Sequence, residues 1–335
     1  MLRFPSPTRF LTCSVVVGVL VLAGCSFDDS PSPAEERQFR TVEAANGVVD
    51  VPAHPRAVAV LWRPTLSAVT QLGHEVVATM GTPGSPDQGL GPFLPEEIDG
   101  ADLNVVTNSP SEDDVNIEEP ANAAPDLIIG VHTQFGAQSD MVQTLEEIAP
   151  TVLLEWEGTG SWREHLQEVA EVLGAEDRPR SVVAEYEQAV EQARQDIVAA
   201  GVDPARTELS LVRLQDENEI RLETSASFPG QVVEDLGFAR PRVQEESDGD
   251  IDYIPLSHES LDQADGDVMF VLAGSGYPEA PETFSEGVWT GLSAVQQERV
   301  FRADQDVWGS ATYYAAHSIV EEVTAALVGQ KEPAV

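Results

Sequence analysis

The chain has 335 residues, a formal net charge of −40 at pH 7 and two cysteines, Cys13 and Cys25. A charge this negative repels nucleic acid and anionic lipid, so we expect no function on either. Because both cysteines lie near the start, the rest of the chain can form no disulfide and no cysteine metal site. Lys331 is the only lysine among 18 basic residues, so nearly all cations are arginines, which can bond planar anions through two N–H groups.

Residues 1–24 have the order of regions of a secretory signal. Two arginines precede a mostly apolar run over residues 10–23, which is too short to span a bilayer. The run Leu22-Ala23-Gly24-Cys25 resembles the lipobox of bacterial lipoproteins, which implies cleavage before Cys25, a lipid on its thiol and an extracytoplasmic, membrane-anchored protein. The alternatives are an ordinary cleaved signal and a short membrane anchor. Residues 25–38, rich in Ser, Asp, Pro and Glu, are predicted to be a flexible tether.

The rest of the chain predicts an α/β fold with mostly parallel sheets, because short β-branched runs alternate with helical patterns. A helix is expected over 64–72, beginning at Pro64 and ending before Gly73, and a last helix over 311–328. Strands are predicted at 57–61, 75–79, 127–129, 151–154, 209–214 and 268–272.

A long charged segment, residues 178–200, predicts one helix of about six turns, since its apolar residues recur at helical spacing. This helix would join an N-terminal α/β lobe, residues 39–177, to a C-terminal α/β lobe, residues 201–330. A weak repeat supports the division: Glu118 precedes an Asp-Leu-Ile-Ile run by eight positions, and Glu259 precedes Asp-Val-Met-Phe by the same eight. Coincidence between two common helix–strand units is the alternative.

These residues resemble the iron-siderophore and vitamin B12 binding lipoproteins of ABC importers over roughly residues 40–328. The order and spacing of several elements carry the resemblance, although no single one is specific. They are residues 51–56, 116–118, 124–129, 162–174, 228–237, 240–241, 256–259, 288–295 and Val300.

The resemblance implies two α/β lobes joined by one long helix, and binding without chemistry. A ferric siderophore would lie between the lobes of a monomer that has no cofactor or metal of its own, and an ABC permease with its ATPase would receive it. The sequence agrees, because it lacks a Gly-x-Ser-x-Gly elbow, a phosphate loop with lysine and a His-Glu-x-x-His motif. Cobalamin and haem are alternative ligands. A direct zinc or manganese binder is less favoured because the six histidines are scattered, and an undetected hydrolase is a further alternative.

Candidate ligand-binding residues follow from the rule that open α/β sheets bind ligands at the carboxyl ends of their strands. Arginines suit the negative face of a ferric catecholate or hydroxycarboxylate, and aromatic rings pack against its apolar parts. Ion pairs with surface acids and packing within loops are the respective alternatives. Trp162 and Trp289 are assigned to the core, and the siderophore class stays open. The candidates are Trp62, Arg63, Met80, His132, Gln134, Trp156, Arg213, Arg221, Phe228, Tyr253, Tyr277 and Trp308.

Glu118 and Glu259 have a separate role in the resemblance, which implies that they dock into arginine pockets of the permease. The alternative is that each merely places a negative charge at a helix N-terminus. The single linking helix further predicts only a small closure between the free and the bound protein.

Overall fold

The computed structural model describes residues 38–80, 90, 94–95, 104–107, 118–133, 138–215, 219–245, 251–274 and 283–335. For Met80, residues 104–107 and residues 118–120 only the backbone is described. All described residues belong to one compact unit, Arg37–Val335. The described residues begin at residue 38. They therefore do not include the predicted signal, Cys25 or any residue of the predicted tether except its last.

The first sheet has five parallel strands in the order β5-β4-β3-β6-β7. Strands β3 and β6 are buried throughout or nearly so, as expected for parallel strands covered on both faces. The strands are β3 (Val58–Val60), β4 (Val76–Met80), β5 (Asn104–Thr107), β6 (Leu127–His132) and β7 (Thr151–Glu155). The helices in this part are α1 (Arg63–Gln71), α3 (Glu118–Ala123), α4 (Val142–Glu146) and α5 (Trp162–Leu173), with the 3-10 turn η2 (Thr159–Ser161) before α5. An antiparallel hairpin that the sequence analysis did not predict comes first, formed by β1 (Phe39–Ala44) and β2 (Gly47–Pro52).

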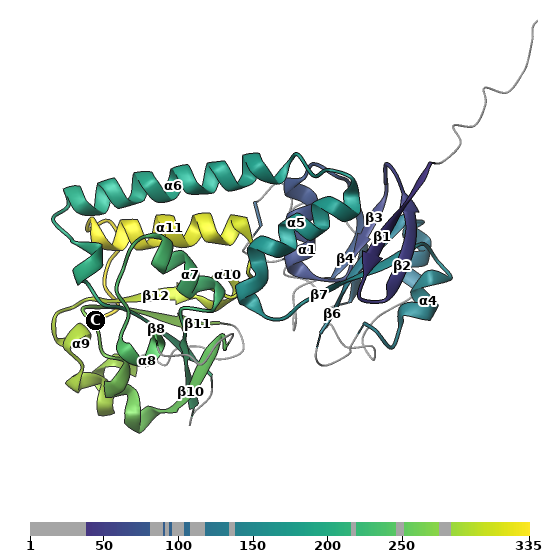
Figure 1. The fold of residues 1–335 in the computed structure, drawn as a ribbon. Helices are drawn as coiled ribbons and strands as arrows, with labels where there is room; N and C mark the ends of the chain where they lie inside the picture. Colours follow the sequence, from purple (N-terminus) through teal and green to yellow (C-terminus); the bar gives the residue numbers. More distant parts are fainter. Residues whose placement is uncertain are drawn as a thin grey trace, which may run out of the picture. The chain divides into compact units, whose positions relative to one another are not determined.

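The predicted long helix is α6 (Pro179–Ala199). Proline opens it, and Gly201 follows with a φ of 89°, a left-handed conformation that suits glycine at a helix end. Its buried side chains include Tyr186, Val190 and Ile197, at the spacing of one helical face. This face packs against the last helix, α11 (Tyr313–Leu327), which runs beside α6 in Figure 1.

The second sheet also has five strands, in the order β10-β9-β8-β11-β12. β8, β11 and β12 are parallel, whereas β9 and β10 add antiparallel strands at one edge. The strands are β8 (Leu209–Leu214), β9 (Glu219–Glu223), β10 (Tyr253–Ser257), β11 (Val268–Ala273) and β12 (Val300–Asp304). The helices are α7 (Phe228–Asp235), α8 (Arg242–Glu245), α9 (Ser293–Gln296), α10 (Gln305–Trp308) and α11, and the 3-10 turns are η3 (Pro204–Arg206), η4 (His258–Ala264), η5 (Thr283–Ser285) and η6 (Gly287–Gly291).

An aromatic cluster joins the elements around Trp162. This residue of α5 is 2% exposed, and its ring centroid lies 5.6 Å from that of Tyr186, 5.2 Å from Phe228 and 4.5 Å from Tyr313. Four helices, α5, α6, α7 and α11, therefore share one aromatic centre. One continuous hydrophobic cluster contains buried residues of both sheets, such as Val60 and Phe270.

The predicted strands and the predicted long and final helices are confirmed within one or two residues at their ends, except that the strand predicted at 127–129 extends to His132. The internal repeat is only approximate, because Glu118 begins the α-helix α3 while Glu259 is the second residue of the 3-10 turn η4. The lobe boundaries stay a prediction. Within the described residues, no helix is long and apolar enough to cross a membrane.

Candidate ligand-binding site

An aromatic row lies at the carboxyl ends of strands β3 and β7. Trp62 is the residue before α1, and Trp156 directly follows β7. Their ring centroids are 5.6 Å apart in an edge-to-face arrangement, and Trp156 contacts His165 in the same way at 5.1 Å. The indole N–H of Trp62 is buried and has no hydrogen-bond partner among the described residues. The structure thus brings two predicted ligand residues together and adds a histidine to them.

His165 is held inside the protein by α5. It is 3% exposed, and its Nε2 atom lies 2.9 Å from the hydroxyl oxygen of Thr65. Its Nδ1 atom has no partner among the described residues. Burial lowers the pKa of His165 to about 3, because a charged imidazolium would lose its hydration there. The imidazole is therefore neutral at pH 7.

A second cluster forms on the antiparallel edge of the other sheet. Arg213 of β8 lies opposite Arg221 of β9, and Tyr253 of β10 lies opposite Glu223. This register puts all four side chains on one face, because side chains alternate between faces along a strand. The guanidinium carbon of Arg221 lies 4.2 Å from the centroid of the Tyr253 ring, and that of Arg213 lies 5.2 Å from it. Three predicted ligand residues therefore form one arginine–tyrosine cluster.

Both arginines of this cluster have acidic neighbours. Arg213 Nη1 lies 3.2 Å from Glu223 Oε1, which is close enough for an ion pair, but the two groups are not aligned for a hydrogen bond. Arg221 forms a second ion pair, with its Nε atom 3.3 Å from Glu219 Oε1. Glu223 is 4% exposed, and this burial raises the pKa of its carboxyl while Arg213 opposes the rise. Arg213 Nε is buried and has no partner in the described part of the chain. The cluster is thus close to charge balance but retains an unused N–H donor.

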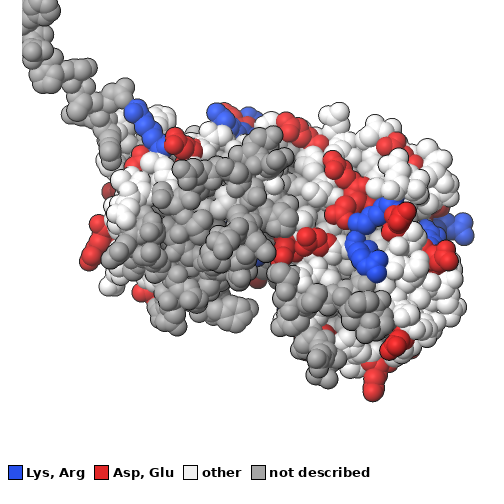
Figure 2. All heavy atoms as spheres, turned by 180° about the vertical axis from the view of Figure 1, so that it is seen from behind, with Lys and Arg blue, Asp and Glu red and all other residues white. Residues whose placement is uncertain are grey.

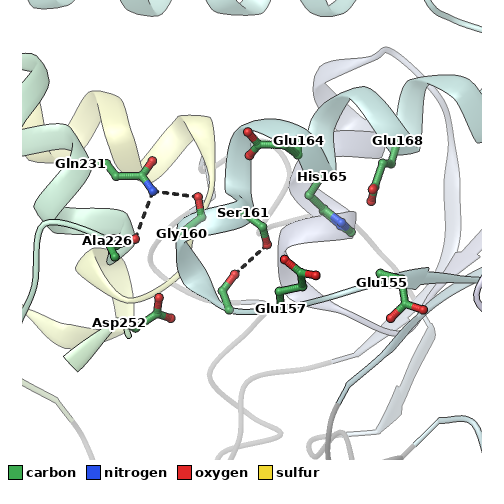
Figure 3. Close-up of a pocket in the computed structure, with 11 residues that line it drawn as sticks. Glu155, Glu157, Gly160, Ser161, Glu164, His165, Glu168, Ala226, Gln231 and Asp252 are labelled. Carbon is green, nitrogen blue, oxygen red and sulfur yellow. Dashed lines mark hydrogen bonds between the residues drawn. The ribbon is translucent and has the colours of Figure 1, made fainter. Parts of the chain in front are cut away.

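A pocket of about 580 Å³ is lined by His165 and by residues that are next to Trp156 and Tyr253 in the sequence. Glu155 and Glu157, which flank Trp156, line it on one side, and Asp252, which precedes Tyr253, lines it on the other. Figure 3 shows Glu164, His165 and Glu168 projecting from α5 into the same region. The lining residues are Glu155, Glu157, Gly158, Gly160, Ser161, Glu164, His165, Glu168, Ala226, Gln231 and Asp252.

Hydrogen bonds fix the segments on either side of this pocket. The Gln231 side chain donates to the carbonyl oxygens of Gly160 and Ala226 at 2.9 and 3.1 Å and accepts from the indole N–H of Trp162 at 2.9 Å. Among the described residues, no group of three or more His, Cys, Asp and Glu side chains could hold a metal ion. The pocket is therefore a rigid, acidic cavity between segments that belong to different sheets.

The pocket residues were not among the predicted ones. Their only sequence signal is local: Glu164 and Glu168 are four residues apart and so share one face of a helix, and Glu155 and Glu157 are two apart at a strand end. In a chain with 58 acidic residues such spacings arise by chance, so the pattern did not mark a site.

Two other predicted residues lie at strand ends without joining either cluster. Arg63 is the first residue of α1; burial lowers its pKa, and the nearby Asp306 opposes that effect. His132 ends β6, and its Nδ1 atom lies 2.6 Å from the hydroxyl oxygen of Ser139. Met80 ends β4, and its side chain is outside the described part, as are Gln134 and Tyr277.

Phe228 and Trp308 do not lie at a surface. Both side chains are fully buried: Phe228 packs edge-on against Trp162, and Trp308 stacks on Phe270 with ring centroids 5.0 Å apart. Each follows a turn, as a ligand residue would, but its helix directs the side chain into the core. We leave both out of the proposed site. Trp289 is 6% exposed and, like Trp162, is a core residue, as expected.

The two glutamates expected to contact a permease lie at the starts of corresponding elements. Glu259 is exposed at the first turn of η4. Glu118 opens α3, and its side chain lies outside the described part. Their role in docking stays a prediction.

Two α/β sheets joined through one long helix, with a ligand-sized pocket beside aromatic and arginine clusters, define the class of α/β solute-binding proteins. The model of the periplasmic binding protein family matches residues 91–307. The chain therefore belongs to the periplasmic binding protein family, which confirms the resemblance and the predicted fold class.

Individual relatives agree with this assignment. The chain is 29% identical over 310 residues to the probable siderophore-binding lipoprotein YfiY of Bacillus subtilis, covering 88% of this chain and 90% of that protein. It is 24% identical over 300 residues to the Fe(3+)-citrate-binding protein YfmC of the same organism, covering 88% of each. The structure of Staphylococcus aureus SirA complexed with staphyloferrin B superposes with a TM-score of 0.71 at 20% identity, covering 86% of this chain and 98% of SirA, and so has the same fold.

Proposed function

We propose that this protein captures a ferric siderophore outside the cytoplasm and delivers it to an ABC permease and its ATPase for iron uptake. In this proposal it is a binding protein rather than an enzyme, it works as a monomer, and a lipid on Cys25 holds it at the membrane. The family assignment and the siderophore and ferric citrate named for its relatives support the proposal.

The observation that carries the proposal is the arginine–tyrosine cluster of Arg213, Arg221 and Tyr253, whose last member directly follows the pocket residue Asp252. A ferric siderophore presents a shell of oxygen atoms around the metal and apolar or aromatic groups outside it. Guanidinium N–H groups bond such oxygens, and the tyrosine ring packs against the apolar groups. Arg221 is the more accessible of the two arginines, because its side chain is 26% exposed and that of Arg213 is 17% exposed.

The aromatic row supplies the opposite kind of contact. Trp62 and Trp156 are partly exposed, and both pack against a neighbouring ring. They offer apolar surface to a chelate. Binding here requires no covalent step: the protein orients the chelate and excludes water from part of its surface.

The proposal is tested by tryptophan-fluorescence titration of the full chain in detergent. The panel contains ferric trihydroxamate, ferric catecholate and ferric citrate complexes, cobalamin, haem, and free Zn²⁺ and Mn²⁺. We expect submicromolar quenching by at least one ferric chelate. A response to bare Zn²⁺ or Mn²⁺ alone, or to cobalamin or haem alone, would contradict it.

A further inference from the structure

We propose that the acidic pocket receives a positively charged arm of the bound chelate, so that the natural ligand is a ferric siderophore with a free ammonium or guanidinium group. This inference rests on the proposed function and refines it. It concerns the pocket lined by Glu155, Glu157, Glu164, Glu168 and His165, whose wall also includes Asp252, the residue before Tyr253.

The pocket presents acceptors and no cationic side chain. Five of its eleven lining residues are acidic, and none is lysine or arginine. Within the described residues, none of the four glutamate side chains has a hydrogen bond or ion pair with a protein group. Figure 3 shows the His165 ring between Glu157 and Glu168, with the Glu164 carboxylate turned to the other side of the helix. A donor-only group such as an ammonium complements this arrangement.

The other polar groups of the pocket are already engaged or are acceptors. The amide N–H groups of Gln231 bond two backbone carbonyls, and Asp252 accepts from Thr159. His165 is the exception: it is almost fully buried, it lines the pocket, and its Nδ1 has no partner in the described structure. Unpaired buried polar atoms are rare because each one costs free energy. A neutral imidazole whose Nε2–H bonds Thr65 leaves Nδ1 as an acceptor for a ligand N–H.

The glutamates also repel one another. Burial raises the pKa of Glu168, and Glu171, Glu164, Glu155 and Glu157 raise it further. Negative charges held together without a counter-charge destabilise the free protein. A cationic group in the pocket would relieve this repulsion, and the energy relieved would add to its affinity.

The neighbouring arginines do not create a positive site. Arg213 is balanced by Glu223 and Arg221 by Glu219, so the arginine–tyrosine cluster brings no excess positive charge toward a strongly anionic complex such as ferric citrate. Figure 2 shows a similar mixture on one face, where Lys and Arg side chains lie beside Asp and Glu. A neutral metal centre with a cationic arm fits both the balanced cluster and the acidic pocket.

The experiment compares ferrioxamine B, a ferric trihydroxamate with one ammonium arm, with its N-acetylated form, which lacks that charge. Isothermal titration of the full chain in detergent should show that the ammonium form binds about tenfold tighter or more. In the double variant Glu157→Gln/Glu168→Gln this preference should disappear, so that the two forms bind with equal affinity. The control is Glu146→Gln/Glu147→Gln, which removes two exposed charges outside the pocket and should keep the preference.

Equal affinity of the native chain for the two forms would overturn the inference, and so would tighter binding of ferric citrate than of ferrioxamine B. Failure of all ferric chelates to bind would contradict the proposed function instead. In that case a titration with 1,5-diaminopentane, a dication that contains no chelate, tests whether the pocket by itself binds cations. This compound should shift the His165 imidazole NMR signals in the native chain and not in the double variant. If no shift occurred, or if Mg²⁺ caused an equal shift, the pocket would not be a site for organic cations.

Discussion

Asp252 accepts two hydrogen bonds from Thr159, one from its backbone N–H at 2.7 Å and one from its hydroxyl at 2.8 Å. Thr159 precedes α5 and follows the first sheet, whereas Asp252 precedes β10 of the second. A single carboxylate therefore ties the two parts of the chain together at the wall of the pocket. It acts together with the hydrogen bonds of Gln231 to Gly160 and Trp162, which join the same parts.

Replacing Asp252 by alanine should lower the free energy of unfolding by about 1–3 kcal/mol, because the half-buried N–H and hydroxyl of Thr159 lose their partner. Urea denaturation followed by circular dichroism measures this. Asp252→Asn, which keeps one acceptor oxygen, should cost less. If the alanine variant were as stable as the native chain, the contact would contribute nothing to joining the two parts.

Replacing Arg221 by glutamine should weaken binding of the ferric chelate about tenfold, because a charge-assisted donor and its stacking on Tyr253 are lost. Isothermal titration gives the affinity, and the unfolding curve should barely change because Arg221 is partly exposed. Arg206→Gln, at an exposed position in η3, is the matched control. Equal loss in both variants would point to a general charge effect instead.

The lowered pKa of His165 predicts that the free energy of unfolding depends on pH. Its pKa falls from the ordinary 6.5 to about 3 on folding, so between these pH values the unfolded chain binds a proton that the folded chain does not. The stabilisation associated with this histidine is complete above pH 6.5 and is lost as the pH falls toward 3. The difference in unfolding free energy between native chain and His165→Gln should therefore decrease on acidification, by at most about 1.4 kcal/mol per pH unit. Parallel pH curves for the two proteins would show that His165 is not held neutral.

Replacing Glu118 and Glu259 by alanine together should abolish iron uptake by cells and leave chelate affinity unchanged, because the family resemblance places both at the permease and away from the ligand. Radioactive iron uptake and titration of the purified chain measure the two effects. The double variant Glu146→Ala/Glu147→Ala is the control for lost surface charge. A loss of affinity would instead place one of the glutamates at the ligand.

The sequence predicted six of the eight parallel strands and the long helices, because their signals are local, but it missed β5 and β12. Val58–Val60 and Leu209–Leu214 are apolar or nearly apolar runs, and α6 has a regular apolar stripe between a proline and a glycine. The antiparallel edge was missed, although Glu219–Glu223 alternates polar and apolar residues. Five residues of alternation in an acidic chain are a weak signal. Strands β9 and β10 are separated by about thirty residues, so no local pattern indicates that they pair.

The candidate site was predicted only in part, because only some of its residues follow a strand with a clear local sequence pattern. Trp62 and Trp156 follow strands that the sequence marks clearly, so the rule of strand ends applied to them. Arg213, Arg221 and Tyr253 were chosen from their types and approximate positions, and only the register explains why they meet. The burial of Phe228 and Trp308 and the acidic pocket depend on how distant segments pack, which no local pattern records.

The aromatic centre around Trp162 has a consequence for how the molecule folds. Tyr313, one of its members, comes from the last helix of the chain, and the hydrophobic cluster around it includes residues of both sheets. Neither half can complete its interior before the C-terminal helix is in place, so the protein should unfold in one cooperative transition. A chain that lacks its final residues should therefore fail to reach the native state, and proteases should degrade it faster than the full chain.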